Sequence, residues 1–187
     1  MSPAPAKVTR GEIVLAALDI ISRRGGEALS LTAVAEAVGI RAPSLYKRFS
    51  NRAALMTEVH DRVLADLGRR MRDAQRHKQG AAAIKTMAGA YRAWGKREPR
   101  HYQLLHSASA LAQSETANAA IEPVLEATTA LVGERNALAA ARLLTAFLHG
   151  FVTMENAGEF KMGGSIDAAF AFGLDAIIRG LETREKH

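Results

Sequence analysis

Apolar residues recur at helical spacing along most of this 187-residue chain, and no segment shows the strict alternation of a half-buried strand. The first predicted helix begins near Thr9 and has an apolar face made of Ile13, Ala17, Ile20 and Ile21. A long helix is predicted to begin after Ser50 or Asn51, with an apolar stripe made of Leu55, Val59, Val63, Leu67 and Met71. This pattern predicts an all-α fold, and the hydrophobic content of 48% is ordinary for a globular chain.

Two short helices are predicted between the two longer ones. Ser30 can cap a helix over the segment LTAVAEA, which Gly39 then closes. A further helix should begin near Ala42 with Pro43 in its first turn, where the missing N–H of proline costs no hydrogen bond. Two short helices joined by a glycine-containing turn predict a helix-turn-helix.

The positive charge of the chain is concentrated in its N-terminal part. Residues 1–80 contain 14 Lys and Arg against 8 Asp and Glu, whereas residues 81–187 contain 11 of each. A basic segment joined to a neutral one indicates that the first segment meets a polyanion, although a solvated charged face would show the same asymmetry. Residues 1–8 are predicted to be a disordered tail, and they lack the apolar core of a signal peptide, which favours the cytoplasm.

The stretch GIRAPSLYKRF supplies the side chains that a DNA-reading helix needs. Arg41 can reach a guanine edge, and small residues after it allow the helix end to enter the major groove. Tyr46 and Lys47 are predicted to face phosphate, and Arg52 to meet a second run of backbone. Tyr46 could equally be a packing residue, and Arg48 a solvated one. The predicted DNA-binding residues are Ser30, Thr32, Arg41, Ala42, Pro43, Ser44, Tyr46, Lys47, Arg48 and Arg52.

The stretch SLTAVAEAVGIRAPSLYKRFSNRAALM resembles the helix-turn-helix of the TetR family of bacterial transcriptional regulators. The resemblance covers roughly residues 9–56. It departs from the family pattern at Arg52, where Lys is usual, and at the more basic Lys47-Arg48. The features that carry the resemblance are Ser30, Val34-Ala35, Gly39-Ile40, Leu45-Tyr46, Phe49, Arg52 and Leu55.

The resemblance implies about nine helices in two domains. Residues 9–52 would form a three-helix DNA-binding domain, and residues 53–187 a ligand-binding and dimerisation domain. It also implies a repressor that a ligand releases from a palindromic operator.

Two late segments, 137–152 and 166–181, are apolar on nearly all sides. Both are too short and too interrupted to span a membrane, which takes about 20 apolar residues. A helix at the end of a small domain is rarely buried on both sides by its own chain. The segments therefore predict a homodimer, in which one face packs on the core and the other on a second copy.

A ligand-responsive regulator needs a cavity, and the larger residues of the middle helices are the candidates for lining it. Few charges accompany them, which favours an apolar or weakly polar small molecule. Each of them is also an ordinary core residue by its spacing. The predicted ligand-binding residues are Met87, Tyr91, Trp94, Tyr102, His106, Phe147 and Phe151.

An enzyme is disfavoured by the sequence. The chain has no His-Glu-x-x-His motif and no serine nucleophile elbow, and His101 and His106 are spaced five apart, which does not align two metal ligands on a helix. We predict no catalytic residues, no metal and no cofactor. The alternative function is that of a helical dimeric interaction protein without specific DNA readout, which would explain the apolar helices but not the basic stretch.

Overall fold

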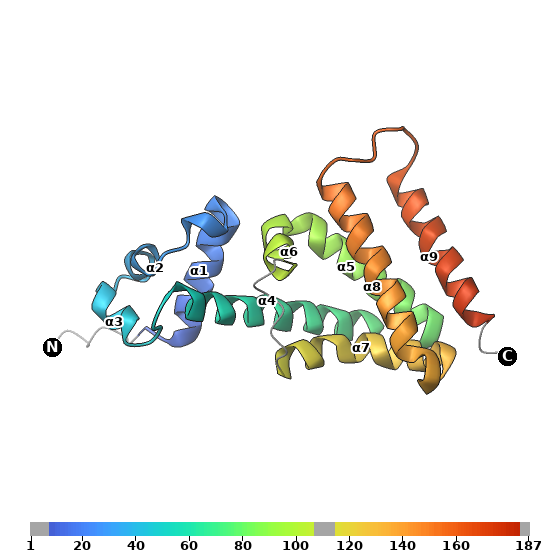
Figure 1. The fold of residues 1–187 in the computed structure, drawn as a ribbon, viewed down its shortest axis with the longest axis horizontal. Helices are drawn as coiled ribbons and strands as arrows, with labels where there is room; N and C mark the ends of the chain where they lie inside the picture. Colours follow the sequence, from blue (N-terminus) through green and yellow to red (C-terminus); the bar gives the residue numbers. More distant parts are fainter. Residues whose placement is uncertain (1–7, 107–114, 184–187) are drawn as a thin grey trace. The chain divides into compact units, whose positions relative to one another are not determined.

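A computed structural model describes residues 8–106 and 115–183, so the predicted tail over residues 1–8 lies, apart from Val8, outside the described residues. Within those ranges the chain forms nine α-helices, one short 3-10 helix and no strand, which confirms the all-α prediction. In chain order (Figure 1) the elements are α1 (Arg10–Arg24), η1 (Gly26–Ala28), α2 (Leu31–Ala37), α3 (Ala42–Tyr46), α4 (Arg52–Gln75), α5 (Gly80–Arg97), α6 (Pro99–Leu105), α7 (Glu115–Val132), α8 (Glu134–Asn156) and α9 (Ile166–Glu182).

The chain divides into two compact units, and the predicted functional boundary between residues 52 and 53 stays a prediction. The first unit is Met1–Leu64 with Arg100–Ala112, and the second is Ala65–Pro99 with Gln113–His187. The boundary falls inside α4 because that helix runs unbroken from one unit into the other. The first unit also includes α6, since the Oγ of Ser22 lies 2.6 Å from the Nε2 of His101, and Arg100 Nη1 donates to the Ser22 carbonyl at 2.9 Å.

The first unit is a small helical bundle in which polar side chains cap the starts of α1 and α4. Thr9 and Glu12 form a capping box at the start of α1, in which each side chain accepts the backbone N–H of the other. At the start of α4, Asn51 rather than Ser50 is the cap, and its Oδ1 accepts from the amide of Ala54 at 2.9 Å. The buried core of this unit includes Ile13, Ala17, Ile20, Ile21, Leu29, Leu31, Val34, Leu45, Phe49, Leu55 and Val59.

The second unit is built from the end of α4 with α5, α7, α8 and α9. A Cβ on Gly68 of α4 would lie only 3.0 Å from the Cα of Ala120 in α7, so the absence of a side chain allows these two helices to approach closely. Pro123, which by its residue type favours the start of a new turn or a kink, lies buried inside the continuous α7. Figure 1 shows α8 and α9 side by side, joined by the loop over residues 157–165.

An ion-pair network ties α5 to α8 and α9, with Arg92 and Glu155 nearly enclosed at its centre and Asp167 and Lys96 exposed at its edge. The guanidinium of Arg92 donates from two nitrogens to the two carboxylate oxygens of Glu155, both at 2.7 Å, and it also pairs with Asp167. Lys96 adds a second cation at 2.7 Å from Glu155, and the Arg92 guanidinium lies 4.7 Å from the ring centre of Phe170. Only 7% of the Glu155 side chain is exposed. The hydrogen bonds from Arg92 lower the pKa of the Glu155 carboxyl below its ordinary value.

We predict that Glu155→Gln destabilises the second unit in a pH-dependent way. A lowered folded-state pKa means that the carboxylate stabilises the fold above the unfolded Glu pKa of about 4.3, and that this contribution disappears as the pH falls through the folded value. At pH 7 the destabilisation should be about 3 kcal/mol, because Arg92 keeps its charge in a buried position without its main partner. Urea unfolding followed by the fluorescence of Trp94, the single tryptophan, measures it.

The matched control is Asp19→Asn, which removes one carboxylate from the exposed ion pair with Arg23 on α1. Such surface pairs contribute about 0.5 kcal/mol. If Glu155→Gln is no more destabilising at pH 7 than this control, or if its effect is the same at pH 7 and pH 3, the network does not stabilise the fold in the way described.

Candidate nucleic-acid interface

The predicted helix-turn-helix is present between residues 30 and 49. The hydroxyl of Ser30 caps α2 by accepting from the amide of Ala33 at 3.1 Å. Gly39 has a φ of +69°, which lets the chain leave α2 and bond the amide of Ile40 back to the Ala35 carbonyl at 3.0 Å. The five-residue α3 follows, with Pro43 in its first turn. Glycine, cap and proline therefore have the roles that the sequence predicted for them.

Burial of two side chains decides which face of α3 meets solvent. Leu45 and Phe49 are fully enclosed in the core of the first unit. Tyr46 is 53% exposed, so the structure places it outside the core. Of the ten predicted DNA-binding residues, Ala42 and Arg48 are half-buried and eight are exposed, namely Ser30, Thr32, Arg41, Pro43, Ser44, Tyr46, Lys47 and Arg52. The outer face of α3 is thus polar, with basic side chains at both ends.

Two of the predicted DNA-binding arginines make hydrogen bonds within the unit. Arg52 donates from Nε to the Leu29 carbonyl at 2.9 Å and from Nη2 to the Gly26 carbonyl at 2.7 Å. Arg48 donates from Nη1 to the carbonyl of Val8. Both side chains therefore hold backbone in place, and their contact with DNA stays a prediction. Their internal acceptors lie 23 and 40 residues away, beyond what sequence spacing can foresee.

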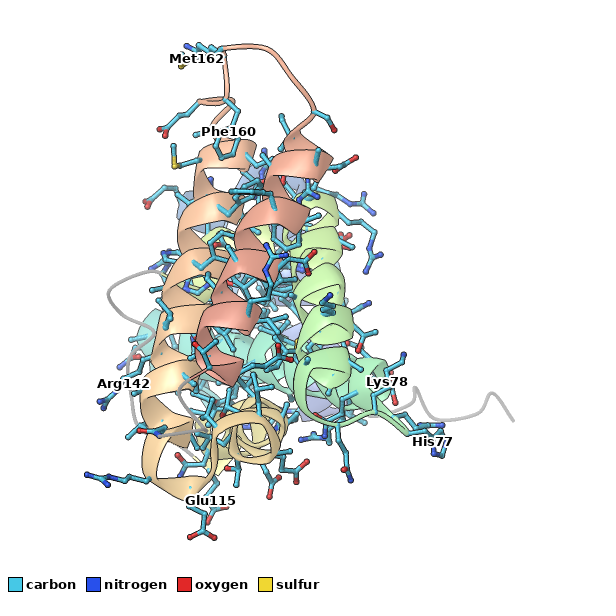
Figure 2. The ribbon with its side chains drawn as sticks, turned by 90° about the vertical axis from the view of Figure 1, so that its right-hand side faces the viewer. His77, Lys78, Glu115, Arg142, Phe160 and Met162 are labelled. Carbon is cyan, nitrogen blue, oxygen red and sulfur yellow. The ribbon has the colours of Figure 1, made fainter. Side chains whose placement is uncertain are left out.

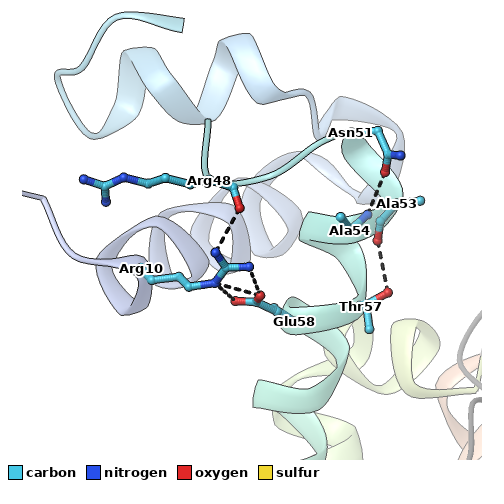
Figure 3. A network of polar contacts seen from close by, with 7 residues as sticks. All are labelled: Arg10, Arg48, Asn51, Ala53, Ala54, Thr57 and Glu58. Carbon is cyan, nitrogen blue, oxygen red and sulfur yellow. Dashed lines mark hydrogen bonds and ion pairs between the residues drawn. The ribbon is translucent and has the colours of Figure 1, made fainter. Parts of the chain in front are cut away.

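Sequence reasoning missed a third arginine, Arg10, at the start of α1 (Figure 3). Its Nε lies 2.8 Å from both carboxylate oxygens of Glu58 on α4, and its Nη1 donates to the Arg48 carbonyl at 2.9 Å. The guanidinium carbon also lies 4.3 Å from the centre of the Phe49 ring. Hydrogen bonding to Glu58 raises the pKa of Arg10 above its ordinary value. Neither helical spacing nor a motif marks these residues as partners.

The seven predicted ligand-binding residues are divided between the two units. Tyr102 and His106 lie at α6 and directly after it in the first unit, with ring centres 4.6 Å apart. Met87, Tyr91 and Trp94 are buried on one face of α5 in the second unit. The remaining two, half-buried on α8, belong to an aromatic cluster formed by Phe147, Phe151, Phe160 and Phe170. A pocket that includes all seven stays a prediction.

The histidines of the middle and late helices bond within the fold. His101 contacts Ser22 as described, and His149 Nδ1 lies 3.5 Å from the Oγ1 of Thr153. Within residues 8–106 and 115–183, no group of three or more His, Asp or Glu side chains is placed to hold a metal ion.

The outer faces of α8 and α9 expose apolar side chains. Phe172 is 73% exposed, and Leu138, Leu143 and Met154 are exposed on α8. A groove of about 370 Å³ lies between the two helices, and its walls include Ala139, Leu143, Ala176 and Gly180. Figure 2 shows Arg142 pointing away from α8, Phe160 near the upper ends of the helices, and Met162 at the tip of the connecting loop.

Among the residues that the structure describes, α8 is long and apolar enough to cross a membrane by length and composition alone, so the prediction that this segment is too short for a span was wrong. It also carries Arg142 near its middle and packs against α5, α7 and α9.

Comparisons with known proteins agree with this architecture. Residues 13–59 match the family described as bacterial regulatory proteins, tetR family, and residues 84–177 match the family described as tetracyclin repressor-like, C-terminal domain. The chain is 30% identical to Rv0681, an uncharacterized HTH-type transcriptional regulator of Mycobacterium tuberculosis, over 98% of this chain and 86% of that protein. It is 26% identical to YobS, another such regulator from Bacillus subtilis, over 96% of each.

A crystal structure of a TetR variant from Acinetobacter baumannii AYE in complex with minocycline has the same fold. Its TM-score is 0.70, with 23% identity over 95% of this chain and 98% of that one. The helix-turn-helix, the helical second unit and the sequence matches together show that the chain belongs to the TetR family of bacterial transcriptional regulators.

Proposed function

We propose that this regulator is a cytoplasmic repressor that binds a palindromic operator as a homodimer and leaves it when a small apolar molecule binds the second unit. The observation that carries the proposal is the outer face of α3, which presents Arg41, Ser44, Tyr46 and Lys47 while Leu45 and Phe49 are buried behind it. Such a face can read bases with its N-terminal end and contact phosphates with the rest. A role as an enzyme has no support among the described residues.

The DNA-binding surface is proposed to divide its work between base and phosphate contacts. Arg41 and Ser44 lie at the N-terminal end of α3, where recognition helices meet base edges, and we assign them to bases. Lys47 lies at the other end, is exposed, and is assigned to a phosphate. Selection of bound sequences from a random DNA pool would identify the operator, which the two-fold symmetry of a dimer makes palindromic.

We expect Arg41→Ala and Lys47→Ala to weaken operator binding in different ways. Arg41→Ala should cost about 1–3 kcal/mol per half-site and relax the preference at one base pair, because it removes a base contact. Lys47→Ala should weaken binding to all duplexes and flatten the salt dependence by about one unit of slope for each phosphate that is no longer neutralised. Titrations of both variants on operator and scrambled duplexes at several salt concentrations measure this.

The two variants serve as controls for each other, since each removes one positive charge from the same helix region. A generic basic surface, as in the alternative of an interaction protein without specific readout, predicts the same uniform weakening for both. An unchanged ratio of operator to scrambled affinity in Arg41→Ala would contradict the assignment of Arg41 to a base.

The homodimer is proposed to form through the outer faces of α8 and α9. Their exposed apolar side chains and the groove between them leave a large surface without cover in the single chain. Small residues such as Ala139, Ala176 and Gly180 in the groove wall allow another helix to approach closely. A second copy buries the same face on both chains.

We expect Phe172→Glu to convert the dimer to a monomer that binds the operator poorly. The carboxylate would be buried without a partner at the interface, which costs about 3–5 kcal/mol and weakens association by about a hundredfold or more. Analytical ultracentrifugation at micromolar concentration measures the mass. Met162→Glu is the control, because Met162 is fully exposed at the loop tip and should leave the dimer intact. A monomeric wild-type chain, or a dimeric Phe172→Glu variant, would rule out this interface.

The effector is proposed to be a small apolar molecule that contacts the second unit. The Acinetobacter TetR variant with the same fold was crystallised with minocycline, which supports a small-molecule ligand for this chain too. Met87, Tyr91, Trp94, Phe147 and Phe151 supply apolar and aromatic surface on α5 and α8 for such a ligand.

We expect compounds that release the operator to change the fluorescence of Trp94. This residue is the single tryptophan and is buried in α5, so its emission reports on the proposed site. A ligand acts only if it binds the released and DNA-bound conformations with different affinities. Trp94→Phe should abolish the signal, because the chain has no other tryptophan. If releasing compounds leave the emission of Trp94 unchanged, the ligand binds elsewhere.

A further inference from the structure

We propose that Arg10 and Glu58 are positioning residues for DNA recognition, which together hold the C-terminal end of α3 in the orientation that presents Arg41 and Ser44 to bases. This inference rests on the proposed function and adds two residues that lie on α1 and α4, outside the helix-turn-helix itself.

The recognition helix needs support from outside because it is short. It has five residues, and the Arg41 side chain at its N-cap position makes no capping hydrogen bond. A helix of this length has no stability of its own, since its first turn costs more entropy than its few hydrogen bonds recover. Its direction is therefore set by what contacts its two ends. Leu45 and Phe49 attach one face of the helix to the core, but apolar contacts alone do not fix its exact direction or rotation.

Arg10 supplies a directional contact at the C-terminal end. Its Nη1 donates to the Arg48 carbonyl at 2.9 Å, and its guanidinium lies over the ring of Phe49, the next residue. Arg48 lies two residues beyond Tyr46, the last residue of α3, so this hydrogen bond fixes the backbone that leaves the helix. The same side chain thus contacts the Arg48 carbonyl, which Figure 3 shows, and the ring of Phe49.

Glu58 fixes Arg10 from the opposite side. Its two carboxylate oxygens accept from Nε and Nη2, so the planar guanidinium is held in a fork and directed at the Arg48 carbonyl. Glu58 lies about two helical turns beyond Asn51, the cap of α4, so the pair links α1, the end of α3 and the start of α4. Lysine could not replace the arginine, because an ammonium has no comparable fixed fork.

A second arginine supports the other end of the motif. Arg52 donates to the Gly26 and Leu29 carbonyls, directly before the Ser30 cap of α2. The entry to α2 and the exit from α3 are therefore each tied by a guanidinium to backbone carbonyls. Arg10 differs from Arg52 in having an acidic partner, Glu58. Its role can therefore be tested by a substitution of Glu58 that leaves the arginine in place.

The sharp test is Glu58→Gln, measured on the operator selected by the wild-type protein and on a scrambled duplex. If Arg10 is a positioning residue, Glu58→Gln should lower operator affinity roughly tenfold, although it removes a negative charge, while scrambled binding and the salt slope stay near wild type. If Arg10 is instead a phosphate contact that Glu58 restrains, the substitution should raise affinity for both duplexes. The second result would overturn the proposal.

Variants of Arg10 complete a double-mutant cycle with Glu58→Gln. Arg10→Gln should lower the operator-to-scrambled ratio by a similar factor, and the double variant should be no worse than either single one, because both act through one contact. Arg10→Lys keeps the positive charge, but its ratio of operator to scrambled affinity should stay close to that of Arg10→Gln. If Arg10→Lys and the wild type have the same ratio of operator to scrambled affinity, the planar guanidinium is not required and the proposal is overturned. The same comparison tests the proposal if Arg10→Gln does not fold.

The matched controls are Arg23→Gln and Asp19→Asn, which remove the same charges from the exposed ion pair on α1. They should leave the ratio unchanged, and a fall in the ratio equal to that of the Arg10 and Glu58 variants would overturn the proposal. A wild-type protein that selects no sequence from the random pool would contradict the proposed function itself. A wild type that selects an operator, with an unchanged ratio in Glu58→Gln, would contradict only this inference.

Discussion

The burial of Leu45 and Phe49 is the interaction on which the DNA-binding unit depends. Between residues 41 and 49 these are the two side chains that reach deep into the core, and their spacing of four places them on one side of a single turn. Once they are inside, the helical period places Lys47, two residues from each of them, on the outer side, while Arg41 is exposed because its extended backbone precedes the first turn of α3. Apolar packing beneath α3 therefore determines which of its side chains face solvent. The hydrogen bonds of neighbouring arginines then adjust the direction of the helix.

The fold could be predicted from local signals because those signals have local causes. The helix start at Thr9, Gly39 with its positive φ, and the apolar stripe from Leu55 to Met71 each act within a few residues of the chain, and each has the predicted role in the structure. The place of α6 could not be predicted in this way. It joins the first unit through the contact of His101 with Ser22, which lies 79 residues earlier in the chain, and no spacing rule connects them.

The candidate site shows the same limit more clearly. The exposure of Lys47 follows from the helical period, and that of Arg41 from its place directly before the first turn of α3, so both could be identified from sequence. An arginine side chain, however, is long enough to bind either DNA or a carbonyl of its own chain. Which of the two it binds depends on the tertiary structure around it. Arg10 pairs with Glu58, which lies 48 residues later in the chain, and Arg92 pairs with Glu155, which lies 63 residues later. A basic residue near a recognition helix is therefore weak evidence of a DNA contact until its acceptors within the fold are known.

The two units are joined in a way that bears on regulation. The chain passes from the first to the second inside α4, which has no linker or glycine break at residues 64 and 65, and it returns at the Pro99–Arg100 bond, immediately before the hydrogen bonds to Ser22. Within the first unit, Arg100 and His101 at the start of α6 contact Ser22 near the end of α1. Since α1 also carries Arg10 at its other end, a displacement of this helix would be felt directly at the exit of α3. A difference of only a few kcal/mol in the free energy with which a ligand binds the DNA-bound and the released conformation changes the occupancy of an operator, because population ratios depend exponentially on that difference.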